Sequence, residues 1–250
     1  MKDLVYYTIG YSPSYVDITE LSIRTLRMFG WSGDIMILCD ESLRELCTQR
    51  IANVEIVTFP DSKTPQEASM RKVTIFDVPG IEMYDRVLFL DSDIVVHVDV
   101  STLFARVTNP ELLYVSTEST DQGCHRHVYF SLENYTEDQL QHFKRHSVHV
   151  FNAGTFAFVR GVTMQQHFAA VRGMIAAHKG NFFYEQSFLN VYFNTRGITD
   201  RSLFSSERYA FHHGDTLNHA GKLVHFCGNP GVGLEKIARM TGYMKHRIPM

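Results

Sequence analysis

Two aspartates separated by one residue stand at the end of the apolar segment 87–93, which closes with Asp91-Ser92-Asp93. The apolar run fits a buried strand, and in an open α/β sheet ligands bind at the carboxyl ends of the strands. Carboxylates at that edge suit a divalent cation such as Mg²⁺ or Mn²⁺, which in turn suggests a phosphorylated ligand. Because Asp-x-Asp triplets are common by chance, a plain polar turn stays open beside the metal site.

Two other kinds of site use such a carboxylate pair. An EF-hand loop starting at Asp91 needs glycine at its sixth position and glutamate at its twelfth, where this chain has Val96 and Thr102, so it is excluded. A haloacid-dehalogenase-type phosphatase would use Asp91 as its nucleophile and Asp93 as its acid. That alternative stays open, although such motifs usually lie near the N-terminus, and here a full βαβ-like stretch precedes the pair.

Three later segments carry polar residues that could complete a site with these aspartates. His225 ends an expected strand and is followed by Gly228, so it could ligate a cation beside backbone that a phosphate can approach. Asn152-Ala153-Gly154 offers an amide next to small residues, and Glu185-Gln186 opens an expected helix. Each also has an ordinary explanation: a core histidine among 13, a turn between strands, and a charged helix start.

The first expected strand ends in Thr8-Ile9-Gly10-Tyr11, a segment suited to a nucleotide. Gly10 permits a tight turn near a ligand, and Tyr11 or Tyr15 could stack on a base. The chain has no GxGxxG motif, so a dinucleotide site is not supported.

In their order along the chain, these segments resemble the family-8 retaining glycosyltransferases, which include glycogenin and bacterial lipopolysaccharide galactosyltransferases. The resemblance extends from Val5 to about Gly228, and the ordered set is specific although each motif alone is weak. It implies a GT-A nucleotide-diphospho-sugar fold, Mn²⁺ or Mg²⁺ as cofactor, and a UDP-sugar donor, with UDP-glucose or UDP-galactose favoured. The product would keep the anomeric configuration of the donor.

The resemblance also implies a role for individual residues. The metal ligands would be Asp91, Asp93 and His225. Lys72 would add positive charge near the diphosphate, and Glu185 and Gln186 would contact the donor sugar. These three residues form the candidate catalytic set. The residues implied to bind nucleotide or donor are Thr8, Ile9, Gly10, Tyr11, Tyr15, Lys72, Ser92, Asn152, Ala153, Gly154, Glu185, Gln186 and Gly228.

Two departures from the family pattern concern the same region. Glu185 stands where the family usually has aspartate, which adds a methylene in the sugar pocket. The lysine that the family usually places after its His-x-x-Gly motif is absent, and Lys236 or glycine amides are the candidate replacements. No strong nucleophile is evident, since Gln186 is a poor one, which favours same-face attack by the acceptor assisted by the departing phosphate.

Strands and helices alternate along the chain, which predicts an α/β fold with a mixed, mainly parallel sheet flanked by helices. Asp17 and Glu20 have capping-box spacing near the start of the first helix, and Gly30 and Gly33 would close it. Strands are expected at 4–9, 34–39, 54–59, 87–90, 112–116, 148–151, 155–159 and 222–226. Helices are expected at about 18–29, 41–50, 67–76, 137–145, 162–178, 185–193 and 234–246.

The 250 residues are 44% hydrophobic and 20% charged, which predicts one domain. Residues 1–116 would form its nucleotide-binding half and 117–250 its donor-sugar and acceptor half. Four scattered cysteines, Cys39, Cys47, Cys124 and Cys227, contain no zinc-binding pair and favour a reducing compartment. No signal-peptide pattern or membrane-spanning apolar stretch is evident, so a cytoplasmic location is expected.

The expected partners are a UDP-sugar and an acceptor hydroxyl on a glycan, lipid or protein. A net charge of −3 gives no support for nucleic-acid binding. Peripheral membrane contact through Lys245-His246-Arg247 stays open, although a solvated helix end is favoured. Self-glycosylation on one of the 12 tyrosines also stays open, and the oligomeric state is not indicated. By position alone, 117–127 and 243–250 are candidate acceptor-side segments.

Overall fold

The computed structural model describes residues 1–117, 137–138, 141, 150–177, 184–212, 219–227 and 233–248. Gly228, Cys124 and the expected loop at 118–127 lie outside these residues, as does most of the helix expected at 137–145. All statements about the structure below concern the described part of the chain.

The described residues form a central seven-stranded sheet with the strand order β3-β2-β1-β4-β7-β6-β8. Neighbouring strands from β3 to β4 are parallel, whereas β7 runs antiparallel to both β4 and β6. The sheet is therefore mixed and mainly parallel, as the sequence predicts. The strands are β1 (Asp3–Ile9), β2 (Asp34–Asp40), β3 (Glu55–Phe59), β4 (Arg86–Leu90), β6 (Leu113–Thr117), β7 (Phe151–Val159) and β8 (Thr199–Phe204).

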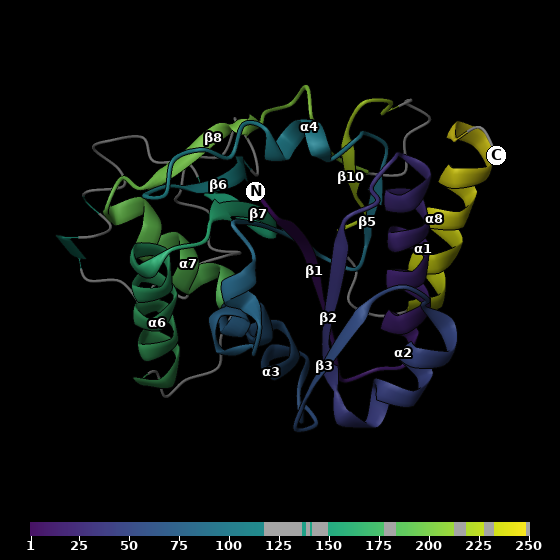
Figure 1. Ribbon diagram of the computed structural model, residues 1–250, viewed down its shortest axis with the longest axis horizontal. Coiled ribbons are helices and arrows are strands. Elements are labelled where there is room, and N and C mark those ends of the chain that lie inside the picture. The colour runs from purple at the N-terminus through teal and green to yellow at the C-terminus, as the bar shows by residue number, and fades with distance from the viewer. Residues whose placement is uncertain are drawn as a thin grey trace.

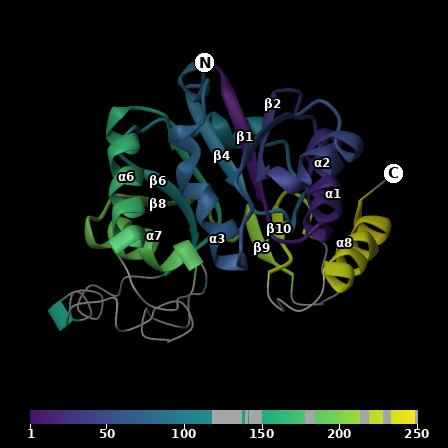
Figure 2. The same ribbon diagram turned by 90° about the horizontal axis from the view of Figure 1, so that it is seen from below.

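Helices cover both faces of the sheet, with α6 and α7 on one side and α1, α2 and α8 toward the other (Figures 1 and 2). Successive side chains of β1 point to opposite faces, so Leu4 and Tyr6 join one apolar cluster while Val5 and Tyr7 join the other. The helices are α1 (Ser14–Met28), α2 (Arg44–Arg50), α3 (Pro65–Met70), α4 (Ser101–Phe104), α6 (Val162–Ala177), α7 (Tyr184–Thr195) and α8 (Gly233–Arg247). The short 3₁₀ helices are η1 (Glu41–Leu43), η2 (Arg71–Asp77) and η3 (Ile81–Met83).

A second, three-stranded sheet carries part of the site. Its order is β5 (Ile94–Val96), β10 (Leu223–His225) and β9 (Tyr209–Phe211) among the described residues. β10 lies antiparallel to β5, with His225 opposite Ile94. The Phe226 amide also donates to the Asp93 carbonyl at 2.9 Å. This pairing brings the end of β10 to the turn that follows β4.

Two local predictions from the sequence are wrong, and a third is correct only in part. Asn152-Ala153-Gly154 is not a turn between strands, because β7 runs through it and pairs with β4 and β6 on either side. The capping box at Asp17 and Glu20 is not formed, since α1 begins earlier, at Ser14, with Pro13 as its cap residue. The helix expected at 67–76 begins at Pro65 and continues as the 3₁₀ helix η2 from Arg71.

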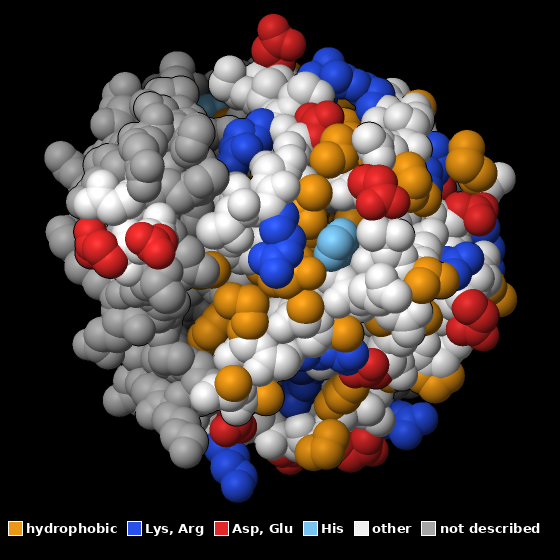
Figure 3. Space-filling model, turned by 90° about the vertical axis from the view of Figure 1, so that its left-hand side faces the viewer, with side chains coloured by type: hydrophobic (Ala, Val, Ile, Leu, Met, Phe, Trp, Pro, Cys, Tyr) orange, Lys and Arg blue, Asp and Glu red, His pale blue; other side chains and the backbone are white. Residues whose placement is uncertain are grey.

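The surface shows two features that bear on binding partners. On the face in Figure 3, described Lys and Arg side chains are interspersed with Asp and Glu, so that face has no continuous basic stripe. Within the described ranges, none of the helices combines the length and apolar character that crossing a bilayer requires.

Candidate active site

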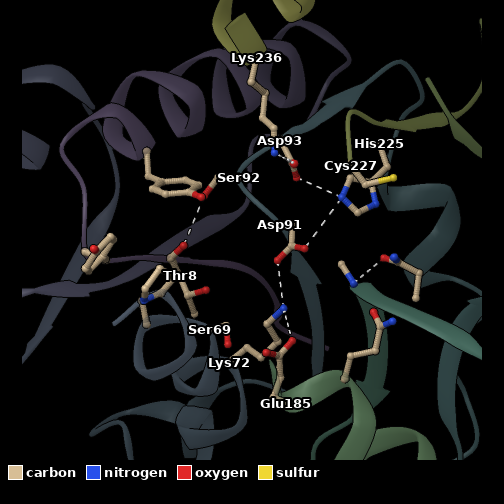
Figure 4. A pocket seen from close by; sticks show the side chains of 18 residues that line it. Thr8, Ser69, Lys72, Asp91, Ser92, Asp93, Glu185, His225, Cys227 and Lys236 are labelled. Atoms are coloured by element: carbon tan, nitrogen blue, oxygen red, sulfur yellow. Dashed lines mark hydrogen bonds and ion pairs between the residues drawn. The ribbon is translucent and has the colours of Figure 1, made fainter. Parts of the chain in front are cut away.

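Asp91, Asp93 and His225 converge at the carboxyl end of β4 (Figure 4). A turn closed by the Ile94 amide donating to the Asp91 carbonyl, at 3.2 Å, brings both aspartates toward the same side. His225 Nε2 lies 3.1 Å from Asp93 Oδ1 and 3.9 Å from Asp91 Oδ2. One ligand atom from each residue lies within 4.8 Å of the others. Two carboxylates and an imidazole form a donor set that suits a divalent ion such as Mn²⁺.

Lys72 joins this cluster to Glu185 at the start of α7. Its ammonium group lies 3.1 Å from Asp91 Oδ1 and 2.7 Å from Glu185 Oε1, and it also donates to the Ala153 carbonyl at 3.3 Å. Burial alone would lower the pKa of Lys72, but the charges of Asp91 and Glu185 outweigh burial and raise it. Lys72 therefore stays protonated and provides a fixed positive charge beside Asp91, Asp93 and His225.

Lys236 reaches the same cluster from α8, and its Nζ lies 2.5 Å from Asp93 Oδ2 (Figure 4). Burial acts to raise the pKa of Asp93, but His225 and Lys236 outweigh burial and hold that pKa below its usual range. The pKa of Lys236 is raised, since the attraction of Asp93 exceeds the effect of burial. The structure thus places Lys236, which the sequence offered as a replacement for the family lysine, beside the carboxylates.

The strand β7 contributes backbone groups and one tightly enclosed glycine. The Gly154 carbonyl accepts from the Asp91 amide at 2.7 Å, and the Gly154 amide donates to Asn152 Oδ1 at 2.8 Å. The Ala153 amide donates to Gln186 Oε1 at 2.8 Å. A Cβ atom added to Gly154 would lie 2.4 Å from His225 Cε1, so only glycine fits between β7 and the histidine.

At the other end of the site, Gly10 and Tyr11 form a tight turn after β1. Tyr11 has a positive φ of 67°, and its amide donates to Asp40 Oδ2 at 2.6 Å. Asp40 is buried and forms an ion pair with Arg71. Burial acts to raise the pKa of Asp40, but hydrogen bonds from the amides of Tyr11 and Ser62 and the charge of the Arg71 guanidinium outweigh burial and lower that pKa. This carboxylate holds the turn, so that the Tyr11 ring, 54% exposed, stands at the cavity.

A cavity of about 350 Å³ connects these groups, a size typical of small-molecule sites. Most residues expected at the site line it, but Ile9 and Ala153 do not, because their side chains are buried in the apolar core. Ala153 takes part through its backbone, whose carbonyl accepts from Lys72 and whose amide donates to Gln186. The lining residues are Thr8, Gly10, Tyr11, Tyr15, Pro65, Ala68, Ser69, Lys72, Asp91, Ser92, Asp93, Asn152, Gly154, Glu185, Gln186, His225, Cys227 and Lys236.

The sequence does not identify several residues that contribute to this site. Asp40 and Arg71 act from behind the turn, and Ser69 and Cys227 lie on the cavity wall. Tyr209 contacts His225 from the three-residue strand β9, which has no periodicity to reveal it. The only usable signal was at Asp40, a carboxylate at the end of an apolar run, as at Asp91.

The chain matches a known protein family and several solved structures. The profile of glycosyl transferase family 8 matches residues 39–230. The galactosyltransferase LgtC, in a crystal structure with donor and acceptor sugar analogues, gives a TM-score of 0.59 at 13% identity over 99% of this chain and 97% of that chain. A sequence comparison with curated proteins found no match.

Two further solved structures share the fold. The bifunctional glycosyltransferase WbbM, solved in its apo form, gives a TM-score of 0.59 at 14% identity, over 99% of this chain and 52% of that one. An active-site mutant of LgtC, in which glutamate replaces glutamine, gives a TM-score of 0.59 at 14% identity over 96% and 95%. This chain therefore spans about half the length of WbbM and nearly all of LgtC.

The mixed sheet, with a cavity that carboxylates and lysines line at the carboxyl end of its parallel strands, has the GT-A fold of the glycosyltransferase LgtC. The family match covers most of the sequence, and the chain belongs to glycosyl transferase family 8. The prediction of family and fold from the sequence is thereby confirmed. The phosphatase alternative gains no support from any of these comparisons.

Proposed function

We propose that this protein transfers a hexosyl group from a UDP-sugar to an acceptor hydroxyl of a glycan, lipid or protein, with retention of configuration and with Mn²⁺ or Mg²⁺ as cofactor. The observation that carries the proposal is the convergence of Asp91, Asp93 and His225 beside Lys72 and Lys236 in one cavity. A cluster of carboxylates and cations is suited to a metal-bound diphosphate.

The proposed metal ligands are Asp91, Asp93 and His225. Their oxygen and nitrogen donors suit a divalent ion such as Mn²⁺, and the set lacks the thiolates that are typical of a structural zinc site. When bound, the ion would neutralise negative charge on the leaving diphosphate. Lys72 and Lys236 would add two fixed positive charges on either side of it.

We assign the donor sugar to the end of the cavity formed by β7 and α7. Within the described chain, Glu185 Oε2 is buried and has no hydrogen-bond partner, although it belongs to a cavity-lining residue. A buried carboxylate oxygen is costly to leave unpaired, so it fits a sugar hydroxyl that donates to it. The opposite end, with Thr8, Gly10, Tyr11 and Tyr15, would hold the uridine. We therefore propose that residues 1–116 hold the nucleotide and that residues 117–250 hold the donor sugar and the acceptor, the division that the sequence predicts.

The orientation of Gln186 favours same-face attack. Its Oε1 accepts the Ala153 amide at 2.8 Å, which directs the amide oxygen to the backbone of β7. A neutral amide held in this way is a poor nucleophile. The acceptor hydroxyl would then attack from the side of the leaving diphosphate and pass its proton to the departing phosphate oxygen.

The proposal is tested by incubating the protein with Mn²⁺ and a panel of UDP-sugars that includes UDP-glucose and UDP-galactose, and measuring released UDP. Wild type is expected to turn over at least one donor only when metal is present. Asp91→Asn and Asp93→Asn should each lose this turnover by about 100-fold or more, because each removes a charged ligand from the metal.

Asp17→Asn is the matched control, since Asp17 lies on the exposed face of α1 and pairs with Arg50 there. It should turn over the donor like wild type. Metal-independent UDP release, or normal turnover in both site variants with intact folds, would contradict the proposed function.

Lys236→Met should change two affinities in opposite directions. The variant removes a cation from the cavity, so the Kd for UDP with Mn²⁺ present should rise about tenfold, as expected for one lost charged hydrogen bond. It also frees Asp93 from its ion pair, so Mn²⁺ alone should bind more tightly. Calorimetric titrations measure both, with Lys245→Met, in the last turn of the same helix, as the control. An unchanged UDP affinity would remove Lys236 from the donor site.

A further inference from the structure

The ring of His225 is held on two sides by residues of β9. The Tyr209 hydroxyl lies 2.5 Å from His225 Nδ1, and the Phe211 ring stacks on the imidazole with centroids 5.7 Å apart and an interplanar angle of 29°. β9 runs parallel to β10, with Phe211 opposite His225 in the register. These contacts leave Nε2 as the ring nitrogen that faces Asp91 and Asp93.

The same tyrosine hydroxyl connects His225 to β7. It lies 3.5 Å from Asn152 Oδ1, which also accepts the Gly154 amide at 2.8 Å. Tyr209 is itself buried, with 4% of its surface exposed, so its hydroxyl depends on protein partners such as these. A continuous chain of contacts therefore runs from the imidazole through Tyr209 and Asn152 to the backbone that touches Asp91.

We propose that Tyr209 is a positioning residue that fixes His225 for metal binding and couples the metal ligands to the Asn152–Gly154 segment of β7. The inference rests on the proposed metal-dependent function, and Tyr209 is not itself one of the proposed metal ligands. A histidine that binds a metal through Nε2 must carry its proton on Nδ1, and that N–H needs an acceptor. The Tyr209 oxygen accepts it, and the hydroxyl proton is then directed to Asn152 Oδ1.

A positioning role differs from simple packing because removing the hydroxyl alone should affect the metal. Tyr209→Phe keeps the ring against Phe211 and loses only the oxygen. Loss of an outer hydrogen-bond partner of a ligating histidine typically weakens metal binding by about 10- to 100-fold. We therefore expect the Kd for Mn²⁺ to rise by that factor in Tyr209→Phe, measured without nucleotide from the EPR signal of the free ion.

Pulsed EPR of bound Mn²⁺ provides a second readout that a merely structural role would not change. Wild type should show the ¹⁴N coupling of an imidazole ligand, and His225→Ala should lack it. Tyr209→Phe, at Mn²⁺ concentrations that saturate the site, should show a weakened or heterogeneous coupling because the ring is no longer held in one orientation.

Tyr84→Phe serves as the matched control. Tyr84 is also buried and donates its hydroxyl to a side chain, Asp34 Oδ2 at 3.0 Å, in contacts separate from the cavity. It should leave both Mn²⁺ affinity and the nitrogen coupling at wild-type values. Thermal unfolding of both variants shows how much stability each lost hydroxyl contributes.

The outcomes separate this inference from the proposed function. If wild type binds Mn²⁺ and Tyr209→Phe binds it with the same Kd and the same nitrogen coupling, the positioning role is wrong while the metal site stands. If wild type itself binds no Mn²⁺, the proposed metal-dependent function fails and the inference fails with it.

Discussion

Replacing Gly154 with alanine is expected to lower Mn²⁺ affinity and UDP-sugar turnover by about 100-fold or more, the effect that misplacing reactive groups by about 1 Å can have. The new Cβ would lie 2.4 Å from His225 Cε1 and 2.7 Å from Asp91 Oδ2. β7 is fixed by pairing with β4 and β6, so His225 and Asp91, the proposed metal ligands, must move rather than the strand. The expected loss therefore arises from geometry and not from a missing functional group.

Gly161→Ala is the control for this experiment, because a Cβ added at Gly161 would meet nothing within 4 Å. Both variants should give the same far-UV circular dichroism as wild type. Equal Mn²⁺ affinity and turnover in the two glycine variants would show that the close approach of β7 to His225 does not constrain the site.

Lys72→Met is expected to reduce the free energy of unfolding by about 3–5 kcal/mol, the usual cost of removing one partner from a buried ion pair. Lys72 and Glu185 are both buried, with side chains 5% and 3% exposed, and their charged atoms lie 2.7 Å apart. Without the ammonium group, Glu185 would keep an uncompensated buried charge at the start of α7. Urea denaturation followed by circular dichroism, without metal or nucleotide, measures this effect independently of activity.

The double variant Lys72→Met/Glu185→Gln should regain most of the lost stability, because it removes both buried charges together. Arg50→Met, which breaks an exposed ion pair with Glu20, should change stability little and controls for the loss of a cation. If Lys72→Met is as stable as Arg50→Met, or if the double variant is no more stable than Lys72→Met, the buried pair does not contribute as described.

The elements that position the site differ in how far the sequence revealed them. β4 and the carboxylates after it were predicted because a continuous apolar run followed by two aspartates is a local pattern. The start of α7, with Glu185 and Gln186 in its first turn, is also recognisable from a local pattern, since an acidic residue is favoured in the first turn of a helix. By contrast, β5 and β9 have three residues each, too few for any periodicity, and their pairing with β10 is long-range.

The segment Asn152–Gly154 shows why local patterns mislead. Asparagine and glycine favour turns when nothing else constrains them, so a turn was the natural prediction. In the structure, pairing with the neighbouring strands and the bond from the Asp91 amide to the Gly154 carbonyl hold these residues extended. Gly154 is needed there for lack of space and not for a turn.

The sequence by itself determined the alternation of strands and helices, the family, and the residue types that gather at the edge of the sheet, because these depend on local periodicity and on motifs in chain order. Only the tertiary structure decided that Lys236 reaches Asp93 and that the Tyr209 hydroxyl contacts His225. It also decided that Glu185 pairs with Lys72. Each of these contacts joins residues more than 10 positions apart, and strand pairing and packing over the whole chain fix their distances.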